Sequence, residues 1–371
     1  MYLRSILTAT TAALLIVGSA TTGNAAVISP TPLSSSHADD GTVYTSVQVG
    51  TRLFVGGSFT SIDGIRRVHL AALNAATGRL DTSFSADVDG DVRSLASDGR
   101  ILFIGGKFTQ VRGVARKNLA AVDTSTGAVV GSFNPAPSGM VRGIDYSGGK
   151  VFFGGGFTKV GGTAVSYLAA VNATTGAVDR AFPGADAAVN VVKAVGGNIW
   201  VGGDFGHIGT SVRTNVATLS IGGGLLGYST TVGGPVNDLA VASTGVFLGV
   251  GGELPGGNSL HKTTLTGAKV WQVATDGDLQ AVEVVGGTVY AGGHFGFLCG
   301  STTAGCTNAR AMKKAFVADA GGTTPNARAW AQFNSALGVH DLRVVGTNLY
   351  ALGVFTTVNG KSAPRIARFG G

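Results

Sequence analysis

The sequence predicts an all-β fold: a seven-bladed β-propeller whose last blade is closed by a strand from the N-terminal end of the mature chain. Three observations support this prediction. A motif with two adjacent glycines returns seven times, its clean copies lie 48 or 49 residues apart, and each interval holds four short strand-like stretches without a helical one. A four-stranded antiparallel sheet repeated around an axis is the blade of a propeller.

The repeated motif is clearest in its first copy, "LFVGGSFTSIDG" (Leu53–Gly64). The later copies are "LFIGGKFTQVRG", "VFFGGGFTKVGG", "IWVGGDFGHIGT", "LGVGGELPGG", "VYAGGHFG" and "LYALGVFTTVNG". Their first glycines are Gly56, Gly105, Gly154, Gly202, Gly251 and Gly292, with Gly353 at the corresponding place in the last copy, so the spacings are 49, 49, 48, 49, 41 and 61 residues. The degraded fifth copy, with Leu254 in place of Phe, leaves six or eight blades as alternatives.

The second repeat shows the layout that we expect of each blade. "DVRSLASDGR" (Asp91–Arg100) alternates apolar and polar residues, and "ILFIGGKFTQV" (Ile101–Val111) is the second strand. "NLAAVDTSTG" (Asn118–Gly127) is the third strand with its turn, and "AVVGSFNPAP" (Ala128–Pro137) is the fourth, stopped by proline.

The two ends of the chain predict how the ring closes. The last repeat supplies only three strands, in "VHDLRVVG", "NLYALGVFTTV" and "APRIARFGG". The segment "AVISPTP" (Ala26–Pro32) resembles "GSFNPAP" (Gly131–Pro137), and we expect it to dock as the missing strand and to cover an otherwise open edge. Residues 26–371 then form one domain of seven units of about 49 residues.

The paired glycines are interpreted as packing positions. In the first copy Val55, Gly57 and Phe59 share one face of the strand. A glycine inside a strand lowers stability unless another group must approach the backbone closely, and we expect an aromatic ring of a neighbouring blade to do so. The recurring phenylalanines Phe59, Phe108, Phe157, Phe205, Phe295 and Phe355 are the expected partners. A dinucleotide-binding loop would need a helix directly after it, and none is predicted.

Residues 1–25 predict a secretory signal peptide. Arg4 precedes an apolar stretch from Ile6 to Val17, and Gly23-Asn24-Ala25 offers a small-x-small cleavage pattern. The stretch is too short to span a bilayer, so we expect an exported protein without membrane insertion, cleaved near Ala25. In that oxidising setting Cys299 and Cys306 predict a disulfide, with free thiols or a metal site that includes His294 as alternatives.

The repeat unit "GG.FT..G....LA.ld..TG" closely resembles the delta-60 repeats, a propeller family of uncharacterised function in secreted bacterial proteins. The resemblance covers the mature chain and is strongest in the first three copies. The segment "GGHFGFLCGSTTAGC…WAQFNSALGVHDLRVVG" resembles the cysteine-bearing blade of actinobacterial members, and a similar GG-x-F pattern occurs in a fungal cortical cell-polarity marker. The resemblance implies a propeller and export, and it supplies no catalytic residues.

Two patterned sets of residues are candidates for ligand binding. The position between the second glycine and the phenylalanine varies from copy to copy, as Ser58, Lys107, Gly156, Asp204, Glu253, His294 and Val354. The loop between the second and third strands carries bases in several copies, and these predict a basic rim: Arg66, Arg67, Arg116, Lys117, Arg213, Lys313, Lys314 and Arg365. Solvated strand ends and ordinary surface bases are the alternative interpretations of these two sets.

Other chemistry finds little support in the sequence. The formal net charge of +7 is spread over 371 residues without a run of bases, which argues against nucleic-acid binding. No cofactor motif or catalytic constellation is present, and "DVDGD" (Asp87–Asp91) lacks the spaced glutamate of a calcium loop.

The sequence therefore predicts a secreted, non-catalytic and monomeric propeller that binds an extracellular protein or a glycan such as a cell-wall polymer. One alternative is a polysaccharide hydrolase or lyase that uses Asp204 and Glu253. The other is a purely structural or adhesive surface protein.

Overall fold

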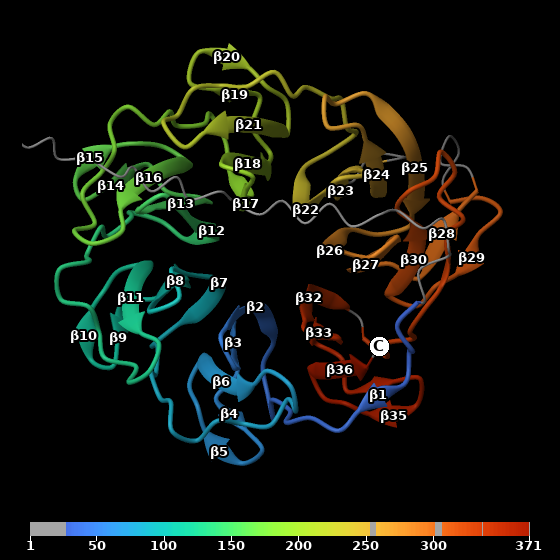
Figure 1. Ribbon diagram of the computed structural model, residues 1–371, viewed down its shortest axis with the longest axis horizontal. Helices are drawn as coiled ribbons and strands as arrows, with labels where there is room; N and C mark the ends of the chain where they lie inside the picture. Colours follow the sequence, from blue (N-terminus) through green and yellow to red (C-terminus); the bar gives the residue numbers. More distant parts are fainter. Residues whose placement is uncertain (1–26, 253–256, 301–305, 336, 371) are drawn as a thin grey trace, which may run out of the picture.

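The computed structural model describes residues 27–252, 257–300, 306–335 and 337–370, and these form a ring of seven β-sheets around a central axis (Figure 1). The predicted all-β propeller is confirmed. None of the residues in these ranges forms a helix, so none of them builds a helix that could cross a membrane. The predicted signal peptide, residues 1–25, lies outside the described residues.

Each blade is an antiparallel sheet that begins with the strand nearest the axis. These inner strands are β2 (Val43–Val49), β7 (Asp91–Ser97), β12 (Val141–Ser147), β17 (Val189–Val195), β22 (Val236–Ala242), β26 (Leu279–Val285) and β32 (Val339–Val345). The second strands, which carry the glycine motif, are β3 (Arg52–Gly57), β8 (Ile101–Lys107), β13 (Lys150–Gly155), β18 (Asn198–Gly203), β23 (Gly245–Val250), β27 (Thr288–Gly293) and β33 (Asn348–Gly353). The third strands are β6 (Leu70–Asn74), β11 (Leu119–Asp123), β16 (Leu168–Asn172), β21 (Val216–Ser220), β24 (Ser259–Thr263), β30 (Ala315–Asp319) and β36 (Ile366–Gly370). Consecutive inner strands lie against each other, and β32 lies against β2, so the ring is closed.

The predicted fourth strand is complete in none of the first four blades. In each of these blades, one described residue after the third strand pairs with that strand. The bridges are Leu73↔Leu80, Val122↔Val129, Val171↔Val178 and Leu219↔Leu225. The prediction of a strand over Ala128–Pro137 is therefore wrong beyond Val129, because the chain turns and buries Phe133 against Phe103, 5.3 Å between ring centres. Blades five and six have true fourth strands, β25 (Lys269–Thr275) and β31 (Arg328–Ala329).

The last blade takes its fourth strand from the N-terminal end of the chain, as predicted. The pairing strand is β1 (Pro32–Leu33), which pairs with β36. Of the segment predicted for this role, Ala26–Pro32, the first residue lies outside the described residues, residues 27–31 do not pair, and Pro32 pairs with Phe369. Instead, Ile28 is buried between blades six and seven, where its amide donates to Tyr290 Oη and its carbonyl accepts from Trp330 Nε1, each at 2.8 Å.

Within the described ranges, six short hairpins join second and third strands and lie at the same end of the ring as the crossovers between blades. The hairpins are β4–β5 (Ser61–Ile62, Ile65–Arg66), β9–β10 (Gln110–Val111, Val114–Ala115), β14–β15 (Lys159–Val160, Thr163–Ala164), β19–β20 (His207–Ile208, Ser211–Val212), β28–β29 (Phe297–Cys299, Arg310–Ala311) and β34–β35 (Thr357–Val358, Lys361–Ser362). Bridges such as Val88↔Val111 join a crossover to a hairpin. We call this end of the ring the top face.

Acidic residues of the crossovers hold these hairpins in place. In the segment "DVDGD", Asp89 accepts hydrogen bonds from the backbone amides of Thr109 and Gln110, each at 2.8 Å, and Asp87 accepts one from the amide of Val68. Asp40 and Asp186 cap the hairpins of their own blades in the same way. These carboxylates therefore have a structural role, and no cluster of three potential metal ligands occurs among the described residues.

The paired glycines pack against two different neighbours, and neither is the predicted aromatic ring of the next blade. A Cβ atom on Gly105 would lie 2.5 Å from Ile144 Cδ1 and 2.6 Å from Val141 Cγ1, both on the inner strand of the next blade. A Cβ atom on Gly106 would overlap the carbonyl oxygen of Asp91, at the start of its own blade. The six recurring phenylalanines are buried within the ring.

Strand register corrects the alignment of two repeats. Gly249 pairs with Asp238 as Gly56 pairs with Thr45, so Gly249 holds the first-glycine position of blade five. In blade seven, Leu352 holds that position, and Gly353 holds the second. Gly251 of blade five occupies the variable position after the second glycine, and Gly252 replaces the phenylalanine. Glu253 and Leu254, which were predicted at these two positions, lie outside the described residues.

The predicted disulfide between Cys299 and Cys306 is present. Cys299 ends β28, which pairs with β25 of the preceding blade through Ala274↔Cys299 and Thr275↔Leu298. The bridge therefore closes the insertion in blade six beside the outer edge of blade five.

Candidate functional site at the mouth of the central channel

A polar cavity of about 170 Å³ lies on the axis of the ring and is lined by residues of all seven inner strands. Its mouth on the top face is formed by the second residue of these strands, or the third residue in β7. In every inner strand the pairing with the second strand skips this residue, as at Tyr44 between Val43 and Thr45. Such a bulge turns a side chain away from the regular ladder. The seven mouth residues are Tyr44, Arg93, Arg142, Asn190, Asn237, Gln280 and His340.

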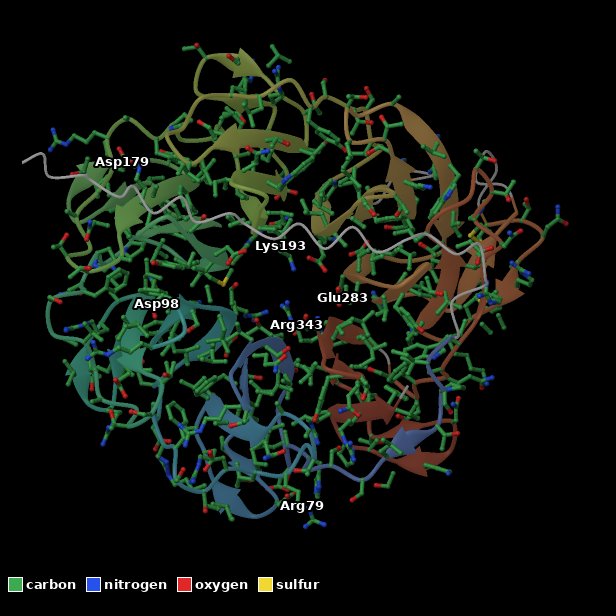
Figure 2. The ribbon with its side chains drawn as sticks, viewed as in Figure 1. Arg79, Asp98, Asp179, Lys193, Glu283 and Arg343 are labelled. Carbon is green, nitrogen blue, oxygen red and sulfur yellow. A yellow bond between two sulfur atoms is a disulfide. The ribbon has the colours of Figure 1, made fainter. Side chains whose placement is uncertain are left out.

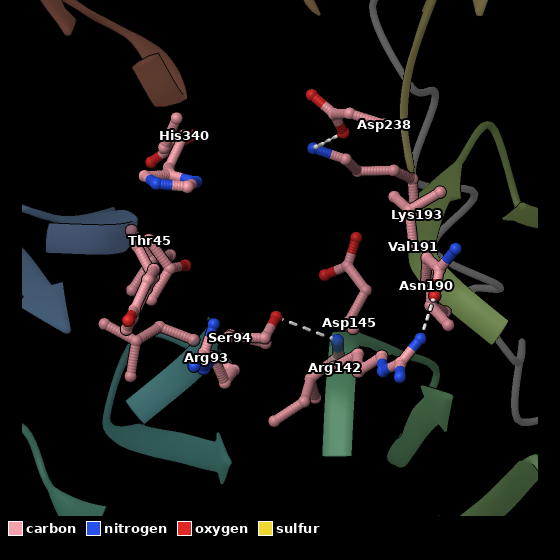
Figure 3. A pocket seen from close by; sticks show the side chains of 18 of the residues that line it. Thr45, Arg93, Ser94, Arg142, Asp145, Asn190, Val191, Lys193, Asp238 and His340 are labelled. Carbon is pink, nitrogen blue, oxygen red and sulfur yellow. Dashed lines mark hydrogen bonds and ion pairs between the residues drawn. The ribbon is translucent and has the colours of Figure 1, made fainter. Parts of the chain in front are cut away.

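Three mouth residues from blades three, four and five form a directed chain of hydrogen bonds. Arg142 Nη1 donates to Asn190 Oδ1 at 2.6 Å, and Asn190 Nδ2 donates to Asn237 Oδ1 at 3.4 Å. Asn237 Nδ2 then donates to the carbonyl oxygen of Leu279 on blade six at 3.1 Å. Figure 3 shows the first of these bonds at the edge of the cavity. Since each side chain is fixed by the next, the remaining donors of the chain are held in set directions.

The other side of the mouth is aromatic. The guanidinium of Arg93 lies 3.8 Å from the centre of the Tyr44 ring, and the His340 ring meets Tyr44 edge-on with 5.4 Å between ring centres. Burial, and then the charge of Arg93, lower the pKa of His340 to about 4, so its imidazole is neutral at neutral pH. The mouth thus combines planar polar groups with an aromatic surface.

Charged side chains line the channel below the mouth (Figure 2). One register position, three residues after the mouth residue, holds Asp145, Lys193, Glu283 and Arg343 in four of the blades. Burial raises the pKa of Asp145 and of Glu283. Burial opposes the charge of Lys193, but Asp238, at 3.3 Å, and further carboxylates outweigh it and raise the pKa of Lys193.

Most of these charges join one blade to the next. Asp145 accepts from the amide of Ala194, and Asp238 accepts from the amide of Val282. Asp341 of blade seven accepts from Ser46 Oγ of blade one at 2.6 Å, across the closing seam, where the last blade meets the first. These bonds satisfy backbone and side-chain donors at the inner edges of the blades, where burial without a partner would cost about 1–3 kcal/mol each.

Four of the arginines predicted to form a basic rim bind backbone carbonyl oxygens instead of facing solvent freely. Arg67 and Arg116 are buried, and each donates to its own loop and to the carbonyl of the segment after the third strand, Thr82 and Val130 respectively. Arg213 donates to the carbonyl of Leu226 in the same manner. Arg365 donates to the carbonyls of Ala38, Asp39 and Gly41, and so holds the N-terminal crossover on blade seven.

Five other predicted site residues are exposed on the top face and are spread over several blades. Lys107 and Lys117 belong to blade two, Asp204 to blade four, and His294 and Lys313 to blade six. Asp204 lies 3.9 Å from Arg142 at the mouth, and His294 lines a neighbouring hollow with Asp278 and Lys314. The structure therefore connects Asp204 to the channel mouth, and binding by the other exposed residues stays a prediction.

The mouth residues were missed because no motif marks them. Their one signal is weak: in every copy the residue after the first apolar residue of the inner strand, which is Val or Leu, carries a polar group, and its identity differs among the copies. Without the bulged register, an alternating strand pattern does not show that these side chains point to the axis.

Comparison with known proteins supports the fold and leaves the function open. Residues 52–84, most of the first repeat, match the model of a domain of unknown function (DUF5122) beta-propeller. This match spans a small part of the chain. No curated protein matches the sequence of this chain.

Two solved structures that resemble the chain are a WD40 propeller domain and a computationally designed protein. The WD40 beta propeller domain of Doa1 superimposes with a TM-score of 0.55 at 11% identity, over 92% of this chain and 95% of that one. The computationally designed Ika8 protein superimposes with a TM-score of 0.53 at 13% identity, over 93% of this chain and 100% of that one. At such identities the likeness concerns the fold alone.

Proposed function

We propose that this chain is an exported binding protein that recognises an extracellular glycan at the mouth of the central channel. The propeller supplies a rigid ring, and the mouth residues supply recognition. The observation that supports the proposal most strongly is the chain of hydrogen bonds from Arg142 through Asn190 and Asn237. Preorganised donors and acceptors of this kind suit the hydroxyl groups of a sugar, because little conformational freedom is lost on binding.

Two further features favour a glycan over a protein partner. The mouth is narrow and polar, whereas a protein interface usually needs a broader surface with a well-packed apolar centre. Tyr44 adds an aromatic ring next to these polar groups, which gives the apolar face of a sugar ring a contact surface.

We propose binding without catalysis, because carboxylates of the channel already have structural partners. Asp145, Asp238 and Asp341 are engaged in bonds between blades, so these carboxylates are held as structural acceptors. A hydrolase that uses Asp204 would need a second carboxylate about 5–10 Å away across a cleft. Polysaccharide cleavage that is lost on Asp204→Asn would support that alternative.

A glycan array with the protein from residue 27 onward tests the proposal. We expect saturable binding of a defined glycan class that Asn190→Ala weakens by about five- to thirtyfold, since a hydrogen-bonded polar contact contributes about 1–2 kcal/mol. Arg79→Ala is the matched control, because Arg79 is an exposed residue in the turn after a third strand, far from the mouth (Figure 2).

Two results would contradict this function. One is the absence of glycan binding by the folded protein. The other is glycan binding that Asn190→Ala and Arg142→Ala leave unchanged.

A further inference from the structure

Below the mouth, blades six and seven place two opposite charges close together without pairing them. Glu283 on β26 and Arg343 on β32 hold equivalent positions on adjacent inner strands and point toward the axis (Figure 2). Neither forms an ion pair with any described residue within 4.0 Å. The other charges at this depth are already engaged: Lys193 with Asp238, Asp145 with two backbone amides, and Asp341 with Ser46.

Polar atoms around these two charges also lack a partner among the described residues. They are Gln280 Oε1 and His340 Nε2, at the mouth above Glu283 and Arg343, and Nε of Arg343 itself. To the part of the chain that the structure describes, Arg343 makes one hydrogen bond, from Nη2 to the carbonyl oxygen of Ser46 at 3.1 Å. Among the same residues, the carboxylate of Glu283 accepts only from its neighbouring amide, Val284, at 3.2 Å. Buried polar atoms are normally hydrogen-bonded, so Gln280 Oε1 and His340 Nε2 are unusual, whereas an unpartnered Nε also occurs in other arginines of the described residues, such as Arg93.

The cluster has two ends of opposite character. One end has acceptors, the Glu283 carboxylate and Gln280 Oε1, which suit an ammonium group. The other end has the guanidinium donors of Arg343, which suit a carboxylate, with the neutral imidazole of His340 beside them. The cavity that Gln280, His340 and Arg343 line has a volume of about 170 Å³, more than ten times the ~15 Å³ that one water needs. Glu283 is not one of its lining residues, but it points toward the axis beside them (Figure 2).

We propose that this part of the channel binds a small zwitterion of the α-amino-acid class, with its ammonium on Glu283 and Gln280 and its carboxylate on Arg343. Bound in this way, the ligand would neutralise both unpaired charges at once. The site differs from the glycan site proposed above, since its two charged residues, Glu283 and Arg343, lie below the mouth on blades six and seven, whereas the hydrogen-bonded side chains Arg142, Asn190 and Asn237 lie on blades three to five. Either proposal can therefore fail without the other.

Three small molecules test the charge pattern in the unaltered protein. Glycine carries both groups, acetate lacks the ammonium, and methylamine lacks the carboxylate. In amide chemical-shift titrations of 15N-labelled protein, we expect glycine to bind at least about tenfold more tightly than either analogue, because each end contributes a charged hydrogen bond. The shifts should centre on the backbone amides of β26 and β32.

A matched pair of variants tests the position. Glu283→Gln should weaken glycine binding at least about tenfold, whereas Asp145→Asn, at the equivalent position of blade three, should change it less than about threefold. The proposal is overturned if acetate binds as tightly as glycine, which would indicate a simple anion site. It is also overturned if glycine gives no saturable shift at about 10 mM, or if both variants bind glycine equally well.

Discussion

Six seams between blades are built in one way, and the seventh, which closes the ring, is built in the opposite way. At the six seams a glycine of the second strand faces large side chains on the next inner strand, as Gly105 faces Val141 and Ile144. At the closing seam Leu352 replaces the glycine, and the position equivalent to Ile144 is Ser46, which is fully buried. Leu352 packs in one buried cluster with Val43 of blade one.

This comparison shows that the constraint on a seam is total volume, since the side-chain bulk has moved from one blade to the other. Protein interiors are packed to nearly constant density, so a large residue on one side requires a small one on the other. A glycine retained to hold a ligand would not be replaced by leucine in one repeat together with a matching serine. The paired glycines are therefore packing residues.

Deletion of the N-terminal segment that completes blade seven should have the largest effect on stability. Deletion of residues 27–33 removes β1 and Ile28, exposes the edge of β36 and leaves Tyr290 and Trp330 without their buried partners. We expect a loss of at least about 5 kcal/mol in the free energy of unfolding, measured by urea denaturation. Ile28→Ala alone should lose about 2–4 kcal/mol, and an unchanged midpoint for the deletion would show that the ring is not closed in this way.

A larger side chain at one of the six seams that contain a glycine should have the second largest effect on stability. Gly105→Val places a branched side chain where even a Cβ atom would lie 2.5 Å from Ile144, so we expect a loss of about 3 kcal/mol or more. Gly131→Ala, in the same blade with open space around its Cβ position, is the control and should change stability by less than about 1 kcal/mol. Equal effects of the two variants would argue against tight packing at Gly105.

Acid should weaken the closing seam in particular. His340 of blade seven packs against Tyr44 of blade one, and its pKa is lowered to about 4 in the folded protein. The neutral imidazole contributes fully to the free energy of unfolding above about pH 6.5, the pKa of histidine in the unfolded chain. This contribution, no more than about 3 kcal/mol, is lost as the pH falls toward 4. The difference in stability between the unaltered protein and His340→Gln should therefore change over this range, and a constant difference would contradict it.

Removing the disulfide should have the smallest effect of these changes. The bridge closes a loop of 8 residues from Cys299 to Cys306, outside the contacts between inner strands. A loop of that size corresponds to about 2.5 kcal/mol, so Cys299→Ser with Cys306→Ser should leave a folded ring with a slightly lower melting temperature. Unfolding of this variant at room temperature would mean that the insertion supports a seam.

The blades, the closure of the ring and the disulfide were predictable from the sequence, whereas features that depend on a one-residue register, a bulge or the burial of a loop residue were not. The period of the glycine pairs predicted the blades, and the spare N-terminal segment predicted closure. The compensating pair Leu352 and Ser46 was missed because Gly353 was aligned with the first glycines, and one residue of register decides which face a side chain occupies. The roles of Arg67 and Arg116 were missed because a base in a loop does not reveal that it is buried against carbonyl oxygens. The channel mouth depends on bulges, which leave no signal in a strand pattern.

A double-mutant cycle at the closing seam tests the central claim most directly. Leu352→Gly opens a cavity and Ser46→Leu overfills the seam, so each alone should lower the free energy of unfolding by about 2–4 kcal/mol. Combined, the two changes recreate the arrangement of the other six seams, and we predict that the double variant recovers at least about 2 kcal/mol relative to the sum of the single effects. Additive losses would show that volume is not exchanged across this seam and would contradict the account.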